Sequence, residues 1–363
     1  MNGTPALSFP RVDTARLATG ALVTIVIAIV GLFIVKWSPY YAKTFAAAAH
    51  HSIGASILTG KATAAPAVGW QAAWDYARAY FVAIWQALVL ALLLGACVQV
   101  LVPRAWIAQR LGRLGLGSTA VVGVLAAAGM MCTCCTAPIV VGLRKQRASA
   151  GAAMAMFVAT PTLNPAVLLF IGFVLSWQLA GLRLVSGLAI VAAAAWLANA
   201  FTPRAERDAL GGEIVLSPIE DPSLGFGRVV LAWLAALWWE IRTILPGYVV
   251  VVLLLGAARA WLFPAGLLLH GAGLVTTLIA AIAGTLFVIP TGAEVPIVQS
   301  LSAAGLGIAP AVALLVALPA ISLPSMFIAR SGFRPAVFAA VGGAVALGAI
   351  VAAGVAAALH LTA

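Results

Sequence analysis

Long apolar runs alternate with short polar stretches along most of the chain. Seven of these runs are close to the roughly 17 to 25 residues that a helix needs to cross the hydrocarbon core of a bilayer. They cover about residues 19–35, 80–102, 150–175, 184–201, 244–263, 308–329 and 335–359. Two further apolar segments, 118–143 and 272–301, are interrupted by Pro, Gly and polar residues. The pattern predicts an all-α polytopic membrane protein, and we expect its first helix to be retained rather than removed as a signal peptide.

An internal repeat divides the chain into two halves. The motif LLLGACVQVLVP at 92–103 returns as LLLGAARAWLFP 161 residues later, and CTCCTAPIV at 132–140 aligns with PTGAEVPIV 158 residues later. Internal repeats are a frequent way to build membrane transporters. We therefore predict four parts: an N-terminal membrane helix with an external loop (1–79), a first transmembrane repeat (80–201), a cytoplasmic linker (202–228) and a second transmembrane repeat (229–363).

Composition and charge agree with a membrane protein. The 363 residues are 64% hydrophobic and 8% charged, with a mean hydropathy of +1.13. The formal net charge of +11 comes largely from Lys and Arg in short loops. It therefore indicates orientation in the membrane rather than binding to nucleic acid.

Basic residues flank the first interrupted segment on both sides: Arg104, Arg110 and Arg113 precede it, and Arg144, Lys145 and Arg147 follow it. Because Lys and Arg of short loops favour the cytoplasm, both flanks are expected inside and the segment is expected to be a re-entrant hairpin. The matching loops of the second half contain no Lys or Arg and are expected outside. We predict inverted structural repeats with about seven full spans plus two re-entrant hairpins and a cytoplasmic N-terminus. Nine full spans is the alternative.

Six basic residues are expected outside or near the external face, namely Lys36, Lys43, Lys61, Arg78, Arg183 and Arg259. Thirteen others, including the six that flank the first interrupted segment, are expected inside, and Arg242 is ambiguous. Two amphipathic stretches, WQAAWDYARAYF and LAWLAALWWEIR, precede the first helix of each repeat. Their Trp and charged residues are typical of the membrane interface, so Glu240 is expected there.

Three of the four cysteines lie within four positions. Cys132, Cys134 and Cys135 stand beside Thr133 and Thr136, just before Pro138. Deprotonated thiols are soft ligands that prefer soft cations and metalloids, and consecutive non-helical residues can turn two or three sulfurs toward one centre. The alternative is that they are small buried hydrophobes, which is the role expected for Cys97.

Glu294 is the only carboxylate within the predicted membrane core. An ionisable residue there costs roughly 2.5 to 3.5 kcal/mol to insert and is a functional candidate. It occupies the repeat position of Thr136, so opposed hairpins would bring it near the thiols. We favour a role in proton coupling or cation binding, with a neutral, hydrogen-bonded carboxyl as the alternative.

Prolines mark the places where the backbone is expected to open: Pro138, Pro161, Pro165, Pro290, Pro296, Pro319 and Pro324. Opened backbone at membrane depth is tolerated where protein or a water-filled cavity satisfies its polar groups, although kinks used only for packing are the alternative. Thr160, Thr162 and Asn164 of TPTLNP are candidates to line the same cavity, or to form polar contacts between helices.

The CTCCTAP hairpin, the basic turn GLRKQRASAGAA and the helix ATPTLNPAV together resemble the predicted-permease family that includes the trivalent organoarsenical exporters. The resemblance covers about residues 80–359. It implies a permease of the bacterial inner membrane and suggests Cys132 and Cys134 as the match to the Cys-Ser/Thr-Cys element of that family.

We therefore expect a multi-pass secondary permease that exports a thiol-reactive metal, metalloid or organometalloid. Its substrate would contact Cys132, Cys134 and Cys135 transiently, with Glu294 as a proton site. The expected partners are this small substrate and the lipid bilayer, with no nucleic acid, no cofactor and no enzymatic activity. The alternatives are uptake of a sulfur oxyanion and a membrane thiol–disulfide carrier, which would use the C-x-x-C of Cys132 and Cys135 with Cys97 as partner.

Overall fold

A computed structural model describes residues 14–58, 66–111, 116–203, 218–219, 221, 225–264 and 273–362. This part of the chain is helical, and seven of its helical segments are long and apolar enough to cross a membrane. They are Ala15–His50, Trp70–Val100, Ala150–Val174, Trp177–Ala200, Phe226–Leu262, Ile308–Ala329 and Pro335–Ala358. The predicted all-α polytopic membrane fold is thereby confirmed. Most of the predicted linker at 202–228 lies outside the described residues, as do Arg11, Lys61, Arg113, Arg204, Arg207 and His270.

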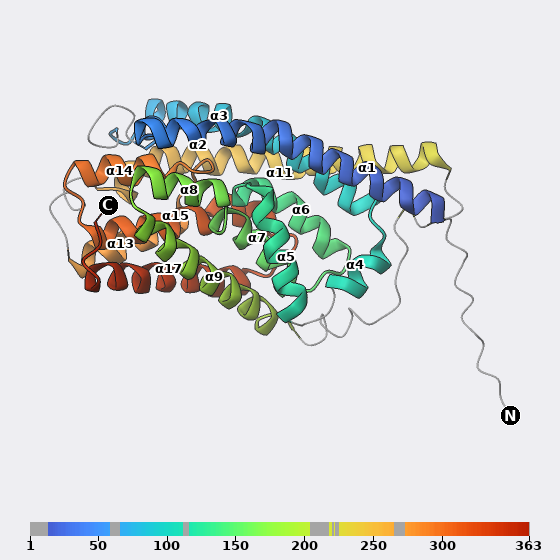
Figure 1. Ribbon diagram of the computed structural model, residues 1–363. Coiled ribbons are helices and arrows are strands. Elements are labelled where there is room, and N and C mark those ends of the chain that lie inside the picture. Colours follow the sequence, from blue (N-terminus) through green and yellow to red (C-terminus); the bar gives the residue numbers. More distant parts are fainter. Residues whose placement is uncertain are drawn as a thin grey trace.

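The N-terminal segment runs along the outside of the bundle (Figure 1). It consists of α1 (Thr14–Leu32), a π-helical turn η1 (Phe33–Trp37) and α2 (Ser38–His50). The expectation of a loop directly after residue 35 was wrong, because the Ala-rich sequence up to His50 continues the helix. Only 6% of the most apolar stretch of this segment is buried, as expected for a helix that faces lipid on most sides.

A pair of long helices, α3 (Trp70–Val100) and α11 (Phe226–Leu262), packs side by side across the molecule. Both include the amphipathic stretches that the sequence placed at the interface, so the boundaries predicted at 79/80 and 228/229 fall inside helices. The two helices come close together at the glycines of the repeated LLLGA motif. A Cβ added at Gly95 of α3 would lie 2.7 Å from a carboxylate oxygen on α11, and one at Gly256 of α11 would lie 2.9 Å from Tyr76 of α3.

The two interrupted segments each form a pair of short helices. In the first half these are α5 (Leu116–Gly129) and α6 (Thr133–Lys145), after the short α4 (Arg104–Leu111). In the second half they are α13 (Leu274–Leu286) and α14 (Glu294–Ala303). None exceeds 14 residues, or about 21 Å, so none spans a hydrocarbon core of about 30 Å alone. In Figure 1, α4 lies toward the N-terminal end of the molecule and α13 and α14 lie near the C-terminus.

The remaining helices occur in two matching sets. The first comprises α7 (Ala150–Thr162), α8 (Pro165–Val174) and α9 (Trp177–Ala200), and the second comprises α15 (Ile308–Ala320), α16 (Leu323–Ala329) and α17 (Pro335–Ala358). Both α15 and α17 begin and end 158 residues after α7 and α9. The matched bounds agree with the predicted repeat, whereas the inverted relation and the re-entrant hairpins stay predictions.

The centre of the fold lies where α7 and α15 meet. α7 contacts α5, α6 and α9, while α15 contacts α13, α14 and α17, and the two central helices also contact each other. In the two membrane spans that contain them, 72% and 83% of the most apolar stretch is buried, which is the highest share among the seven spans. Side chains that face this contact are therefore shielded from lipid by a shell of other helices.

Candidate functional site

Two thiols meet at the first break in the backbone. Cys132 precedes α6 in an extended conformation, and Cys135 lies in the first turn of that helix. The two Sγ atoms are 3.0 Å apart, and both side chains are buried. All four cysteines are free. The sequence predicted that two or three sulfurs face one centre, and the structure places the sulfurs of Cys132 and Cys135 together.

Cys134 points away from this pair. Its Sγ atom lies 3.8 Å from Oγ of Ser322 and close to the hydroxyls of Tyr80 and Tyr248, which are 2.8 Å from each other. Neighbouring residues on a helix project about 100° apart, so Cys134 and Cys135 cannot both face Cys132. Among the described residues, no group of three His, Cys, Asp or Glu side chains is placed to hold a metal ion. The structure thus shows a pair of sulfurs rather than a three-sulfur centre.

The predicted polar residues around the thiols mostly bond to their own helices. Thr136 donates to the carbonyl of Cys132, Thr160 to Met156, and Thr162 to Val158. Asn164 caps α8, where its Oδ1 accepts from the amides of Ala166 and Val167. These groups stabilise the helix ends and turns.

Two other residues predicted from the sequence, Pro138 and Thr133, lie directly at the thiol pair. Pro138 lies inside the continuous helix α6 and lacks the amide hydrogen that would otherwise bond to the carbonyl of Cys134, so one helical hydrogen bond is missing directly beside the thiols. Thr133 lines the same enclosed cavity as Cys132. In contrast, Thr136 and Thr160 line a separate cavity of about 210 Å³, whose other lining residues come mainly from α1, α3 and α5.

Arg183 is the main buried residue of the candidate site that the sequence interpretation missed. We expected it near the external face, but its side chain is 1% exposed at the contact between α7 and α15. It donates to the carbonyls of Leu315 and Val316 on α15 and of Pro161 and Thr162 on α7. The carbonyl of Leu315 lies four residues before Pro319, and the carbonyl of Pro161 lies four residues before Pro165. Because proline has no amide hydrogen, both carbonyls lack their usual helical partner. One guanidinium therefore satisfies both broken helices.

Glu294 faces Arg183 from the start of α14. Its Oε1 lies 3.9 Å from Nη2 of Arg183, and neither carboxylate oxygen has a hydrogen-bond partner within the described residues. Glu294 lines the same small cavity as Cys132, so the break in the second half does meet the thiols. Glu294 is not the only buried carboxylate, however. Glu240, which we expected at the interface, is also fully buried.

Lys36 approaches the paired thiols from the N-terminal segment. We expected this residue outside, but it is buried in the π-helical turn η1. Its ammonium donates to Oγ1 of Thr291 at 3.3 Å and lies near Cys132 and Cys135. Helical turns of this type occur frequently at functional sites.

Tyrosines hold the opened backbone between α13 and α14. Tyr76 donates to the carbonyl of Val288, and Tyr40 donates to the carbonyl of Thr291 at 3.3 Å. These bonds replace the helical partners that a broken segment lacks, as membrane-embedded backbone requires.

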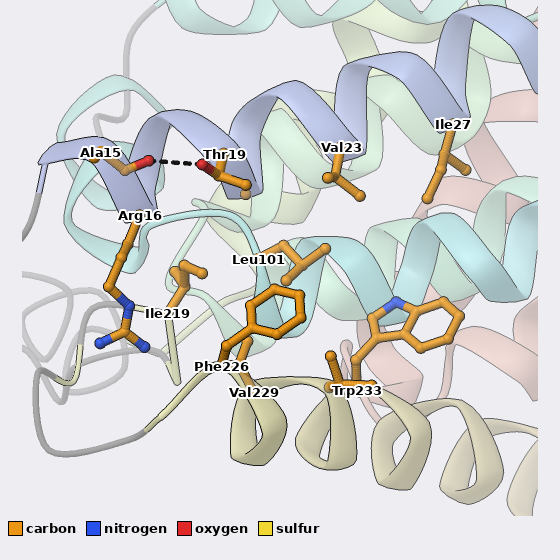
Figure 2. A pocket seen from close by; sticks show the side chains of 12 residues that line it. Ala15, Arg16, Thr19, Val23, Ile27, Leu101, Ile219, Phe226, Val229 and Trp233 are labelled. Carbon is orange, nitrogen blue, oxygen red and sulfur yellow. Dashed lines mark hydrogen bonds between the residues drawn. The ribbon is translucent and has the colours of Figure 1, made fainter.

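The cavity at the site is nearly closed. It has a volume of about 10 Å³, which is about enough for one water molecule. A larger cavity of about 430 Å³ lies elsewhere, between α1, α3 and α11. Figure 2 shows Val23 and Ile27 of α1 facing Phe226 and Trp233 of α11 across it. Because its lining is almost entirely apolar, it is suited to acyl chains rather than to a polar substrate.

The fold and the site together define a class of protein. Ionisable residues in the membrane interior are costly and typically mark a substrate or ion pathway. Broken helices that meet at such residues near the centre of a bundle are typical of secondary transporters.

Comparisons with known proteins identify the family. The chain belongs to the predicted permease family ArsP_1, whose family model matches residues 118–358, and it is therefore a multi-pass membrane transporter. It is similar to UPF0718 protein YraQ of Escherichia coli, with 44% identity over 339 residues that cover 91% of this chain and 92% of that protein. UPF0718 protein MJ0584 of Methanocaldococcus jannaschii is 31% identical over 96 residues, or 26% of each chain. No solved structure matches the chain.

Proposed function

We propose that this permease exports a thiol-reactive metal, metalloid or organometalloid, which binds transiently to Cys132 and Cys135. The observation that supports this most directly is the 3.0 Å separation of the two Sγ atoms beside an enclosed cavity. Two sulfurs at this distance can coordinate one soft atom together, since thiolates are preferred ligands of such atoms. A two-sulfur site also suits transport, because a permease must release what it binds.

The closed cavity requires a conformational change during transport. A site of about 10 Å³ excludes any substrate larger than water, so the helices around it must part. We propose that α5–α6 and α13–α14 are re-entrant hairpins that enter from opposite faces and open alternately. Their short lengths and the matched bounds of the two halves support this arrangement. The N-terminus is then cytoplasmic, and the membrane is the bacterial inner membrane.

Glu294 and Arg183 are proposed to couple this motion to protons. The Glu294 carboxylate is held by a charge 3.9 Å away but by no hydrogen bond within the described part of the chain. Protonation of Glu294 would remove its attraction to Arg183, and Arg183 holds both broken helices. A proton would thus release the start of α14 from Arg183, while the bonds of Arg183 to α7 and α15 remain.

Transport into inside-out membrane vesicles tests the thiol site. Vesicles that contain the wild-type protein should accumulate phenylarsine oxide, and Cys132→Ser and Cys135→Ser should each reduce accumulation to the level of vesicles without the protein. Cys97→Ser is the matched control, because Cys97 is a buried thiol that lies against Trp233 of α11. Unchanged transport by Cys132→Ser and Cys135→Ser at normal protein levels would refute the proposal.

A sulfur oxyanion is the second candidate substrate. The buried ammonium of Lys36 and guanidinium of Arg183 lie around the site with the single carboxylate of Glu294, which leaves an excess of positive charge. Uptake of thiosulfate into right-side-out vesicles distinguishes the two candidates. Uptake that depends on Lys36, is lost in Lys36→Met and occurs without any arsenical transport would favour the oxyanion.

A further inference from the structure

Glu240 forms a second buried polar cluster, on helices that flank the thiol site. Its side chain, on α11, is 0% exposed. Oε1 accepts a hydrogen bond of 2.5 Å from Nε2 of Gln99 on α3, and Oε2 has no hydrogen-bond partner within the described residues. The backbone of α3 covers the carboxyl closely at Gly95, where a Cβ atom would lie 2.7 Å from Oε1.

Within the described part of the chain, the charged side chain near Glu240 is that of Lys145. Lys145, at the end of α6, donates to Oε1 of Gln99 at 2.9 Å, and its Nζ atom lies 3.5 Å from the centre of the Trp239 ring. Gln99 therefore stands between the ammonium and the carboxyl. On α3 the nearby titratable group is Cys97, which accepts from Trp233. Besides α3, α11 packs against α16, whose sequence LPSMFIA has no titratable side chain.

This geometry favours a carboxyl that carries a proton. A buried carboxylate whose second oxygen has no partner pays a large desolvation cost, whereas the cost for the neutral acid is smaller because it carries no charge. The side chain of Lys145 is exposed and is only one amide away from the carboxyl. Because Lys145 belongs to the basic turn that we expect at the cytoplasmic surface, the expected route to water is short. The cluster therefore combines a site that can store a proton with a nearby positive charge that can stabilise the carboxylate after the proton has left.

We propose that Glu240 is a proton-binding site of the permease, which is loaded in this conformation and releases its proton to water beside Lys145. The proton passes from the carboxyl to a water molecule, and the carboxylate that remains is stabilised by the ammonium of Lys145. The helix α6 carries Lys145 at one end and Cys135 at the other. Movement of Lys145 toward an ionised Glu240 would consequently shift the thiol end of the same helix. Only this coupling rests on the proposed function.

Infrared difference spectroscopy of the purified full-length protein tests the proton site directly. The protein has nine Asp and Glu residues, so the carbonyl band of protonated carboxyls is simple enough to assign. At neutral pH the wild type should show such a band that shifts on deuteration, and Glu240→Gln should remove it. Glu294→Gln is the matched control and should retain the Glu240 band. A spectrum of Glu240→Gln that still contains the whole band would overturn the proposal.

A second variant tests the role of Lys145 without altering the carboxyl. In Lys145→Gln the Glu240 band should persist to higher pH than in the wild type, because the cation that stabilises the carboxylate is gone. An unchanged titration would overturn the assignment of Lys145. These spectra need no substrate. If arsenical transport were absent while the Glu240 band behaved as described, the proposed substrate would be wrong and the proton site would stand.

Discussion

Arg183 joins the two halves of the protein through a single side chain. It donates to two carbonyls on α7 and to two on α15, and it faces Glu294 on α14. A guanidinium suits this position because its five N–H donors lie in one rigid plane and can bond to several acceptors at once. Lysine, with one flexible ammonium group, does not offer this arrangement.

Arg183→Met should destabilise the protein by about 3 to 5 kcal/mol, because it leaves Glu294 and the opened carbonyls without their partner. Arg334→Met, at an exposed position before α17, is the matched control and should have little effect. Thermal unfolding in detergent measures both. In the double variant Arg183→Met/Glu294→Gln, part of the loss should be recovered, since the unpaired buried charge is gone. Equal losses in the single and double variants would contradict the pairing.

Single charges within apolar runs proved hard to place from the sequence alone. Cys132 and Glu294 were singled out correctly as buried, because they stand at proline-marked breaks. The sequence interpretation assigned three other charged residues to loops or to the membrane interface, namely Arg183, Lys36 and Glu240. An isolated charge near the end of a predicted helix is typical of either location. Their burial depends on which helix covers them, and that is a property of the tertiary structure. The one available signal was that Arg183 is the only charged residue from 177 to 200.

At the scale of helices, the close approach of α3 and α11 depends on two glycines. Gly256→Ala would place a Cβ atom 2.9 Å from Cβ of Tyr76 and 3.1 Å from the carbonyl oxygen of Ala73. Because neither atom can move away easily, we expect a loss of about 1 to 3 kcal/mol. Gly354→Ala on α17 has open space around its Cβ and is the matched control. A denaturation series that shows no difference between them would contradict this packing.

The proline breaks should matter more for transport than for stability. Pro319→Ala restores an amide hydrogen that can bond to the carbonyl of Leu315, in competition with Arg183. We expect unchanged or higher thermal stability together with strongly reduced transport. Pro335→Ala, at the first position of α17 where proline costs nothing, is the matched control and should transport normally. Full transport by Pro319→Ala would show that the opened backbone is not needed.

The sequence predicted the elements better than their lengths. Hydrophobic runs located each spanning helix, and prolines located the breaks in α7 and α15. The starts of α3 and α11 were predicted 10 and 18 residues too late, because the amphipathic sequences before them have the composition of interfacial segments. Each amphipathic segment nevertheless joins the helix that follows it, and α11 continues even through Pro246. The packing of α3 against α11 therefore decided these helix lengths, rather than local helix-breaking residues.

At the scale of the whole molecule, the proposed topology rests on the predicted repeat. If α5–α6 is a re-entrant hairpin, Gln109 on α4 and Arg147 after α6 lie on the same side of the membrane. Gln109→Cys and Arg147→Cys should both resist a membrane-impermeant maleimide in intact cells and react in inside-out vesicles. Thr362→Cys should react in intact cells, because seven full spans from a cytoplasmic N-terminus place the C-terminus outside. Labelling of Arg147→Cys but not Gln109→Cys in intact cells would contradict the hairpin and favour nine spans.

The central claim is that Cys132 and Cys135 bind the substrate as a pair. Intact-protein mass spectrometry with phenylarsine oxide tests it most directly, because the arsenical condenses with two thiols and loses one water. We expect one adduct per chain for the wild type and for Cys97→Ser, and none for Cys132→Ser or Cys135→Ser. Equal adduct formation in all four proteins would contradict it.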